Sequence, residues 1–186
     1  MPGPMTLQQQ LESGLSHHRA GRLTEAEAVY RQILARNPNH VEALHLLGVL
    51  AVQSGRLETA VELIRQTVRL EPDYAEAHYN LGIALQANGQ ADDAIASYRQ
   101  AIRLRPDLAE AHSNLGNALL EMGQLDEAIA SHRQAVRLKP DLAEAHCNLG
   151  TALKDMGQLD EAIASYRCRG ARQNRPARGA QNRPVL

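Results

Sequence analysis

Tryptophan and phenylalanine are absent from this 186-residue sequence, and five tyrosines leave aromatic residues at 3% of the total. A hydrophobic core therefore has to be built mainly from leucine, alanine and isoleucine. Cysteine is also scarce, since Cys147 and Cys168 are the only two. Two cysteines make no disulfide framework, which argues against a small disulfide-stabilised secreted protein and makes a reducing, cytoplasmic setting the expectation.

Long apolar runs are missing as well. No stretch approaches the roughly 20 apolar residues that a membrane-spanning helix needs. Residues 1–10 lack the charged start and apolar block of a signal peptide. We therefore expect no membrane partner, although the missing signal means little if the chain is a piece of a longer one.

The sequence does contain an internal repeat. Ala75, Ala109 and Ala143 begin successive copies, so the step is 34 residues. Looser copies precede them, and the last copy stops early. A fixed step of this size indicates a solenoid of stacked units, in which function lies on a shared surface. The expected division is a flexible leader at 1–6, units at 7–40, 41–74, 75–108 and 109–142, a truncated unit at 143–168, and a basic, disordered tail at 169–186.

Each unit shows two helical periods separated by a turn. In the 109–142 unit, apolar and small residues recur at helical spacing before Gly123 and again after Leu125. Gly123 stands where a helix needs a left-handed closing residue, and Pro140 stops the second helix. Gly116 and Ala128 are small where the two helices should touch. The unit is therefore predicted to be helix, turn, helix, with about 14 residues in each helix.

The junctions between units contain a capping residue with a glutamate three places on. This spacing is typical of a capping box, in which the two side chains satisfy free N–H groups at a helix start. The predicted boxes are Asn39 with Glu42, Asp73 with Glu76, Asp107 with Glu110, Asp141 with Glu144, and, inside the first unit, Thr24 with Glu27.

These features resemble the tetratricopeptide repeat family. In the 109–142 unit the family pattern falls on His112, Leu115, Gly116, Leu119, Gly123, Ala128, His132, Ala135 and Pro140. The 75–108 unit matches in the same register. Histidine stands where the family often has tryptophan, so these cores should be less bulky. The resemblance implies an all-α fold, a right-handed superhelical α-solenoid of antiparallel helix pairs, with the first helices lining the concave side.

The arginine-rich end breaks the repeat. Residues 167–186 contain six arginines and no acidic residue, and glycine and proline replace the apolar period. A basic arm for nucleic acid is one reading. The other is an artificial end on a truncated array, which we favour because the break falls in mid-helix; nucleic acid is then not the expected partner. Leu149, Leu153 and Ile163 would have an uncovered side, which predicts a homo-oligomer formed through uncapped ends.

No catalytic or metal site is predicted. His78, His112 and His146 recur at the repeat step, and equivalents roughly 10 Å apart cannot share an ion with bonds of about 2 Å. We interpret them as packing residues. No nucleophile has a base beside it, and no glycine-rich phosphate loop occurs. We expect a chain that is not an enzyme, with no cofactor and no bound metal.

The binding prediction rests on the first helices, whose residues beside the core stripe should face the concave groove. The predicted groove residues are Glu76, Tyr79, Asn80, Ile83, Glu110, Ser113, Asn114, Asn117, Glu121, Glu144, Cys147, Asn148, Thr151 and Asp155. Asn80, Asn114 and Asn148 form one column. Because an amide both donates and accepts, such a column could hold the backbone of an extended peptide. The other reading of the column is that each asparagine bonds a neighbouring helix.

The sequence thus predicts a non-catalytic protein-interaction scaffold that binds a peptide or a partner helix. The units are also similar to the repeats of O-linked N-acetylglucosamine transferases, in which an asparagine ladder holds protein substrates. That resemblance implies an alternative, the substrate-recognition segment of a larger glycosyltransferase-like enzyme, with Asn80, Asn114 and Asn148 as the ladder. Leu46 and Ser13 interrupt the column in the earlier units. A self-associating assembly module is the third hypothesis.

Overall fold

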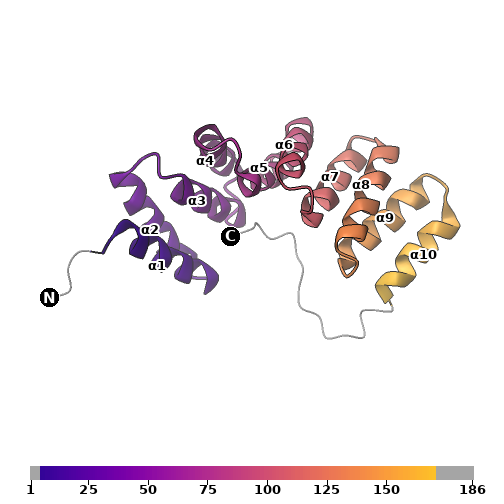
Figure 1. Cartoon of the computed structure of the whole chain (residues 1–186), viewed down its shortest axis with the longest axis horizontal. Helices are drawn as coiled ribbons and strands as arrows, with labels where there is room; N and C mark the ends of the chain where they lie inside the picture. The colour runs from indigo at the N-terminus through magenta and orange to yellow at the C-terminus, as the bar shows by residue number, and fades with distance from the viewer. Residues whose placement is uncertain (1–4, 171–186) are drawn as a thin grey trace.

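A computed structural model describes residues 5–170, with side chains through Arg167, and contains ten helices in that range (Figure 1). Each unit contributes two helices of nearly equal length. The helices are α1 (Leu7–Arg19), α2 (Leu23–Arg36), α3 (Val41–Gln53), α4 (Leu57–Leu70), α5 (Ala75–Ala87), α6 (Ala91–Leu104), α7 (Ala109–Glu121), α8 (Leu125–Leu138), α9 (Ala143–Asp155) and α10 (Leu159–Gly170). The predicted all-α solenoid of helix pairs is confirmed. Residues 171–186, most of the predicted tail, lie outside the described part.

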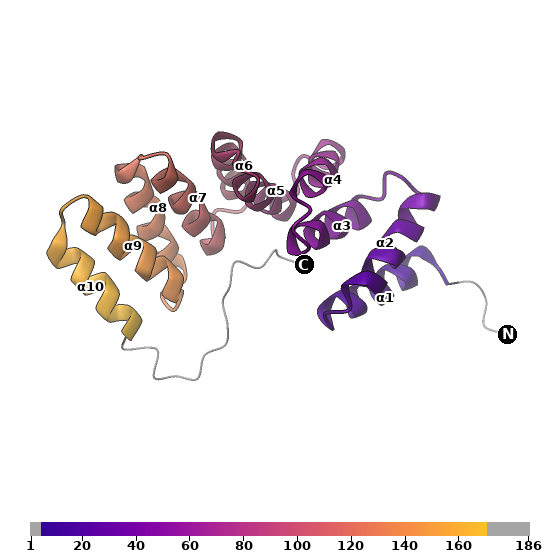
Figure 2. The ribbon, with the colours of Figure 1, turned by 180° about the vertical axis from the view of Figure 1, so that it is seen from behind.

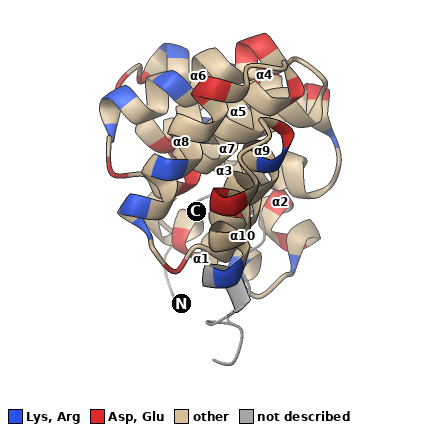
Figure 3. Ribbon diagram, turned by 90° about the vertical axis from the view of Figure 1, so that its right-hand side faces the viewer, with Lys and Arg blue, Asp and Glu red and all other residues tan. Residues whose placement is uncertain are grey.

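The helix pairs follow one another in an arched row (Figures 1 and 2). The second helices α4, α6 and α8 lie on the outside, and α3, α5 and α7 lie within (Figure 3). Each helix packs against the next, and the first helices α3, α5, α7 and α9 also pack against one another. Among residues 5–170, no helix is both long enough and apolar enough to span a bilayer.

A glycine closes the turn inside every unit. Gly123 has φ 72°, a left-handed conformation that side chains with a Cβ rarely adopt, as the sequence predicted. Its equivalents do the same, with φ between 71° and 80° at Gly21, Gly55, Gly89 and Gly157. The five turns therefore share a left-handed glycine at the same place, which lets the second helix of each unit turn back along the first.

The contact between the two helices of a unit needs a second glycine. A Cβ built on Gly116 would lie 2.5 Å from Cε1 of His132, closer than real side chains approach. Ala128, also predicted at this contact, is fully buried. Small residues at these two places let α7 and α8 approach closely.

The predicted capping boxes between units are not formed. Helices α5, α7 and α9 begin after Tyr74, Leu108 and Leu142, and no side chain caps them. The aspartate before each of these residues instead lies within a turn, which for α5 is closed by Tyr74 N–H donating to the Glu71 carbonyl at 3.3 Å. A proline occupies the turn's second position, and the turn shifts the helix start one residue past the predicted one. The first junction differs only in that His40 Nδ1 accepts from the Ala43 amide.

The first unit corrects two further predictions. Thr24 lies inside α2, whose start has no side-chain cap. A capping box does exist at Thr6, which the sequence placed in the leader. Its hydroxyl accepts from the Gln9 amide at 3.2 Å, and Gln9 Oε1 accepts from the Thr6 amide at 3.0 Å.

The last described unit is covered on one side. Leu149 and Leu153 are buried, contrary to expectation, because α10 continues to Gly170 and packs on them through Ala162 and Tyr166. Ile163 is exposed, as predicted. It is 48% accessible, whereas the equivalent Val61, Ile95 and Ile129 are only 4–6% accessible beneath the following unit.

Arginine–carboxylate pairs link successive second helices on the outer face. Each arginine reaches the acid 28 positions further on: Arg65 to Asp93 at 2.9 Å, Arg99 to Glu127 at 2.7 Å and Arg133 to Glu161 at 2.7 Å. These side chains are about half exposed, so each pair contributes at most about 1 kcal/mol. Their spacing repeats with the units, so each pair joins the second helices of two successive units.

Candidate binding groove

The predicted groove residues lie on α5, α7 and α9, the first helices of the last three described units. These helices pack side by side along the inner side of the row (Figure 3). Each helix therefore has one face toward its neighbours and one face turned away from them. Which of the predicted residues can meet a ligand depends on which of these faces they occupy.

The first two asparagines of the predicted column, Asn80 and Asn114, are buried. Asn80 has no exposed surface and Asn114 only 3%. The amide of Asn80 lies 2.8 Å from Nε2 of His45, and the amide of Asn114 donates to the Tyr79 hydroxyl at 3.3 Å. Each contact joins a first helix to the first helix of the preceding unit. The prediction that these two residues belong to an accessible ladder is therefore wrong, because both form contacts between units.

Their neighbours on the same helices are also buried. Tyr79 and Ser113 are 2% and 3% exposed, because the fifth position of each first helix faces the following unit. The Tyr79 hydroxyl accepts a hydrogen bond from Asn114, whereas the Ser113 hydroxyl has no hydrogen-bond partner among the described residues. A serine is too short to reach the place that the tyrosine hydroxyl fills.

The contact around Asn80 includes residues that the sequence analysis did not single out. His45 is buried between the Asn80 amide and the Tyr74 hydroxyl, which lies 3.0 Å from Nδ1. With the amide nitrogen at Nε2, that ring nitrogen accepts, so Nδ1 carries the proton and donates to Tyr74. Burial lowers the pKa of His45 to about 4, against a smaller opposite effect of Glu76. A neutral histidine is thus built into this junction.

The contacts of His45 and Tyr79 follow one regular offset in the sequence. His45 and Tyr79 occupy the same position of successive units, and each is met by the asparagine 35 residues later. The sixth position of one first helix thus contacts the fifth position of the preceding one. Sequence periodicity contains this offset, but only packing shows that the offset side chains meet.

Of the predicted groove residues, those of α9 keep exposed surface, as does Asn117 of α7. Asn148 is half-buried and donates to Asn117 Oδ1 at 2.7 Å, so the third asparagine bonds within the groove wall. Thr151 and Asp155 are exposed along α9, and the Thr151 hydroxyl lies 3.1 Å from the Tyr166 hydroxyl. Cys147 is half-buried beside them. This part of the inner wall presents amide, hydroxyl and carboxylate groups.

The three glutamates that open the first helices have different surroundings. Glu76 pairs with Arg105, and Glu110 pairs with Lys139 at 2.7 Å, each within its own unit. Glu144 has no cationic partner among residues 5–167, and burial raises its pKa. It is therefore the carboxylate of this row that a cationic group of a ligand would stabilise most.

The remaining predicted residues lie at the edges of the groove. Ile83 is partly buried against the central apolar cluster. Glu121, at the end of α7, is exposed and accepts from Gln86 Nε2 at 2.7 Å. Ile83 therefore contributes to the core, and Glu121 links α7 to α5.

The recurrent histidines have a separate structural role. Nε2 of His78, His112 and His146 lies 2.8, 3.1 and 3.0 Å from the carbonyl oxygens of Pro72, Pro106 and Pro140 respectively. Because a carbonyl only accepts, each ring donates its Nε2 proton. Each histidine fixes the loop that precedes its own helix, and the three act separately.

Comparison with known proteins gives consistent matches. The family model described as "TPR repeat" matches residues 86–123 and 116–157, and the one described as "Tetratricopeptide repeat" matches residues 17–82 and 51–96. No curated protein matches the chain in sequence.

Solved structures match over most of the chain. A crystal structure of MamA is 29% identical and covers 87% of this chain and 94% of its own, with a TM-score of 0.80. MamA 41-end from Desulfovibrio magneticus RS-1 is 21% identical, with coverage of 92% and 97% and a TM-score of 0.83. YrrB, described as "a TPR protein with an unusual peptide-binding site", is 20% identical, with coverage of 90% and 87% and a TM-score of 0.75. The last two show the fold alone. Because 405 solved chains match, the fold selects no single partner.

Proposed function

Because residues 17–157 of this chain are tetratricopeptide repeats, we propose that it is a non-catalytic protein-interaction scaffold. Its inner wall binds an extended peptide or a partner helix. The described peptide-binding site of YrrB offers a parallel on the same fold. The side chains on the inner wall of this chain determine which ligand it binds.

One observation supports the site most directly: Asn117 of α7 and the polar residues Asn148, Thr151 and Asp155 of α9 keep exposed surface, whereas the asparagines at the middle of α5 and α7 do not. Asn117, Asn148 and Thr151 retain exposed surface, whereas Asn80 and Asn114 are closed by His45 and Tyr79. An extended ligand needs backbone donors and acceptors within reach. We therefore place the ligand against the C-terminal half of the row.

The charge of the inner wall indicates which kind of peptide it binds. Glu121, Glu144 and Asp155 border this region, and Lys154 is the only lysine or arginine on α7 or α9. A peptide with a lysine or arginine near Glu144 would pair with a carboxylate that burial already penalises. The preferred ligand is a polar peptide with at least one basic residue.

The test is a selection of peptides from a random displayed library on the whole chain. Thr151→Arg places a long cationic side chain on the open wall, and Ala35→Arg makes the same change at an exposed position of α2. Selected peptides should lose roughly tenfold or more in affinity for Thr151→Arg and keep their affinity for Ala35→Arg. Equal binding to both variants would remove the inner wall as the site.

The glycosyltransferase-like alternative required three accessible asparagines. Asn80 and Asn114 are buried and Asn148 is half-buried, so the arrangement favours the simpler scaffold.

Self-association is supported by a separate observation. Ile163 is ten times more accessible than its covered equivalents such as Val61, at 48% against 5%. Leu159, one turn earlier on α10, is 59% exposed. A second copy of the chain that covers this face of α10 would bury both residues.

A further inference from the structure

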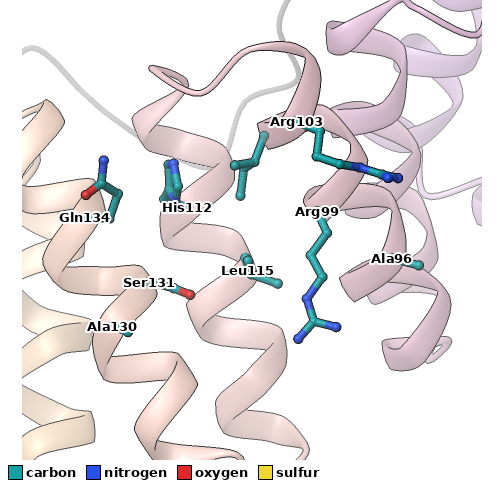
Figure 4. Close-up of a pocket in the computed structure, with 9 residues that line it drawn as sticks. Ala96, Arg99, Arg103, His112, Leu115, Ala130, Ser131 and Gln134 are labelled. Carbon is teal, nitrogen blue, oxygen red and sulfur yellow. The ribbon is translucent and has the colours of Figure 1, made fainter.

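The outer face contains an open groove that the proposed function does not use. It lies between the second helices α6 and α8, with α7 as its floor, and encloses about 750 Å³. Figure 4 shows His112 and Leu115 of α7 between the side chains of α6 and those of α8. Since α6 and α8 lie outside and the predicted binding wall lies inside (Figure 3), the two surfaces are separate.

The middle of the groove is apolar and has room for a side chain. Ile102 and Leu115 form its floor, and the exposed Ala96 and Ala130 form its two walls. Alanine on both walls leaves the space that a longer side chain would fill. A leucine-sized group of a ligand would bury its surface on Ile102 and Leu115, at roughly 25 cal/mol per Å².

The end of the groove near the helix C-termini is positively charged. Arg103 lines the groove on α6, and Arg137 on α8 lies beyond its lining residues, near enough to His112 for its charge to act there. Both arginines are exposed, and neither has a carboxylate partner among residues 5–167. His112 lies between these helices, and burial, with a smaller effect of the Arg137 charge, lowers its pKa. Arg99 differs from both because Glu127 already neutralises it.

We propose that this outer groove binds an acidic amphipathic segment of a partner protein. An apolar side chain of the segment packs over Leu115 and Ile102, and its carboxylates pair with Arg103 and Arg137. The apolar floor contributes most of the affinity, and the two arginines select a ligand of negative charge. His112 holds the floor rigid through its bond to the Pro106 carbonyl.

The equivalent outer surface between α4 and α6 provides an internal comparison. Between α4 and α6 the arginine equivalent to Arg103 is Arg69, but Glu62 replaces Ala96. Glu62 is exposed at that wall position, so it narrows the space and repels a carboxylate. An acidic segment should therefore choose the groove over α7, and Arg69 serves as the matched control.

The probe is a fluorescein-labelled synthetic peptide of about 15 residues, long enough to form a helix on a surface. It has leucine at i and i+4 and glutamate elsewhere on the same face; a second peptide has lysine in place of every glutamate. Fluorescence anisotropy with the whole chain should show binding of the glutamate peptide that weakens with salt. Arg103→Gln with Arg137→Gln should weaken it roughly tenfold or more, and Arg69→Gln by less than about twofold.

Two further variants complete the test. Ala130→Gln fills the wall at an exposed helix position and should abolish binding while the thermal unfolding midpoint stays unchanged. Thr151→Arg, on the inner wall, should leave binding of the glutamate peptide as it is. Equal affinity for the lysine peptide would contradict the proposal that the outer groove binds an acidic segment. Binding that only Thr151→Arg weakens would contradict it too, and would instead support the inner wall as the binding site.

Discussion

His132 lies over Gly116 with no exposed surface, and neither of its ring nitrogens has a hydrogen-bond partner among the described residues. Tyrosine occupies this place in three other units. Its hydroxyl reaches a partner in each: Tyr30 meets His18, Tyr98 donates to Gln86, and Tyr166 meets Thr151. In the unit of His132 the partner position of Gln86 is Leu120. The two ring nitrogens of His132 are therefore buried without a hydrogen bond among the described residues.

Replacing His132 by phenylalanine should stabilise the protein. The ring keeps its contact with α7, and two buried nitrogens that lack partners disappear. We expect about 1–2 kcal/mol of added stability, since an unsatisfied buried polar group costs about 1–3 kcal/mol. Urea unfolding gives the value. His112→Phe should act oppositely and lose about 1 kcal/mol, because His112 donates to Pro106; shifts of the same sign would contradict this account.

Two buried histidines should make stability depend on pH. The pKa values of His45 and His132 are lowered by burial to about 4, from an ordinary value of 6.5. Between these values the unfolded chain binds a proton that the folded chain does not. Stability is therefore complete above about pH 6.5 and falls as the pH drops toward 4, by up to about 3 kcal/mol for each histidine.

Unfolding in urea at several pH values measures this dependence. His132→Phe removes one of the two groups, so its stability should fall less steeply from pH 6.5 to 4 than that of the parent chain. Parallel curves for the two proteins would show that His132 does not titrate in this way.

At the scale of the helix pair, small residues decide how closely α7 and α8 pack. A Cβ at Gly116 would lie 2.5–2.8 Å from three ring atoms of His132. The ring is buried and cannot swing away. Its displacement has to be shared with the helices around it.

Gly116→Ala should therefore destabilise the protein by about 1–3 kcal/mol, the usual cost of overpacking, although alanine favours helix formation. Thermal and urea unfolding both report it. Ala143→Ser, at the exposed start of α9, is the control and should stay within about 0.5 kcal/mol. If Gly116→Ala proves as stable as the parent chain, the helices are less tightly packed than the structure indicates.

At the scale of the whole molecule, each unit is covered by the next, and the last described unit is the exception. Stability of such a row is approximately the sum of unit and neighbour terms. The exposed Ile163 marks the place where a neighbour term is missing among the described residues.

Self-association through α10 should therefore increase with protein concentration. Ile163→Lys should shift the sedimentation distribution toward the monomer, whereas Arg36→Gln, at the exposed end of α2, should leave it unchanged. A monomer at every concentration for the parent chain would exclude this interface.

The inner wall shows how far the sequence leads at this scale. The repeat step gives Asn80, Asn114 and Asn148 the same position in α5, α7 and α9. Whether an asparagine in that column meets a ligand or a neighbouring helix depends on the residue it faces. Asn114 faces Tyr79, which is long enough to bond it, whereas Asn148 follows a unit with the short Ser113 and turns to Asn117.

The sequence by itself determined the all-α row of helix pairs, the glycine turns and the small contacts at Gly116 and Ala128, because periodicity, turn conformation and side-chain volume are local properties. The helix starts were predicted less well. A proline turn competes for the same aspartate, and backbone geometry settles that competition. Only the tertiary structure decided that His45 and Tyr79 close the upper wall and that an outer groove opens over Leu115. Both depend on which side chains of successive units come within reach of one another.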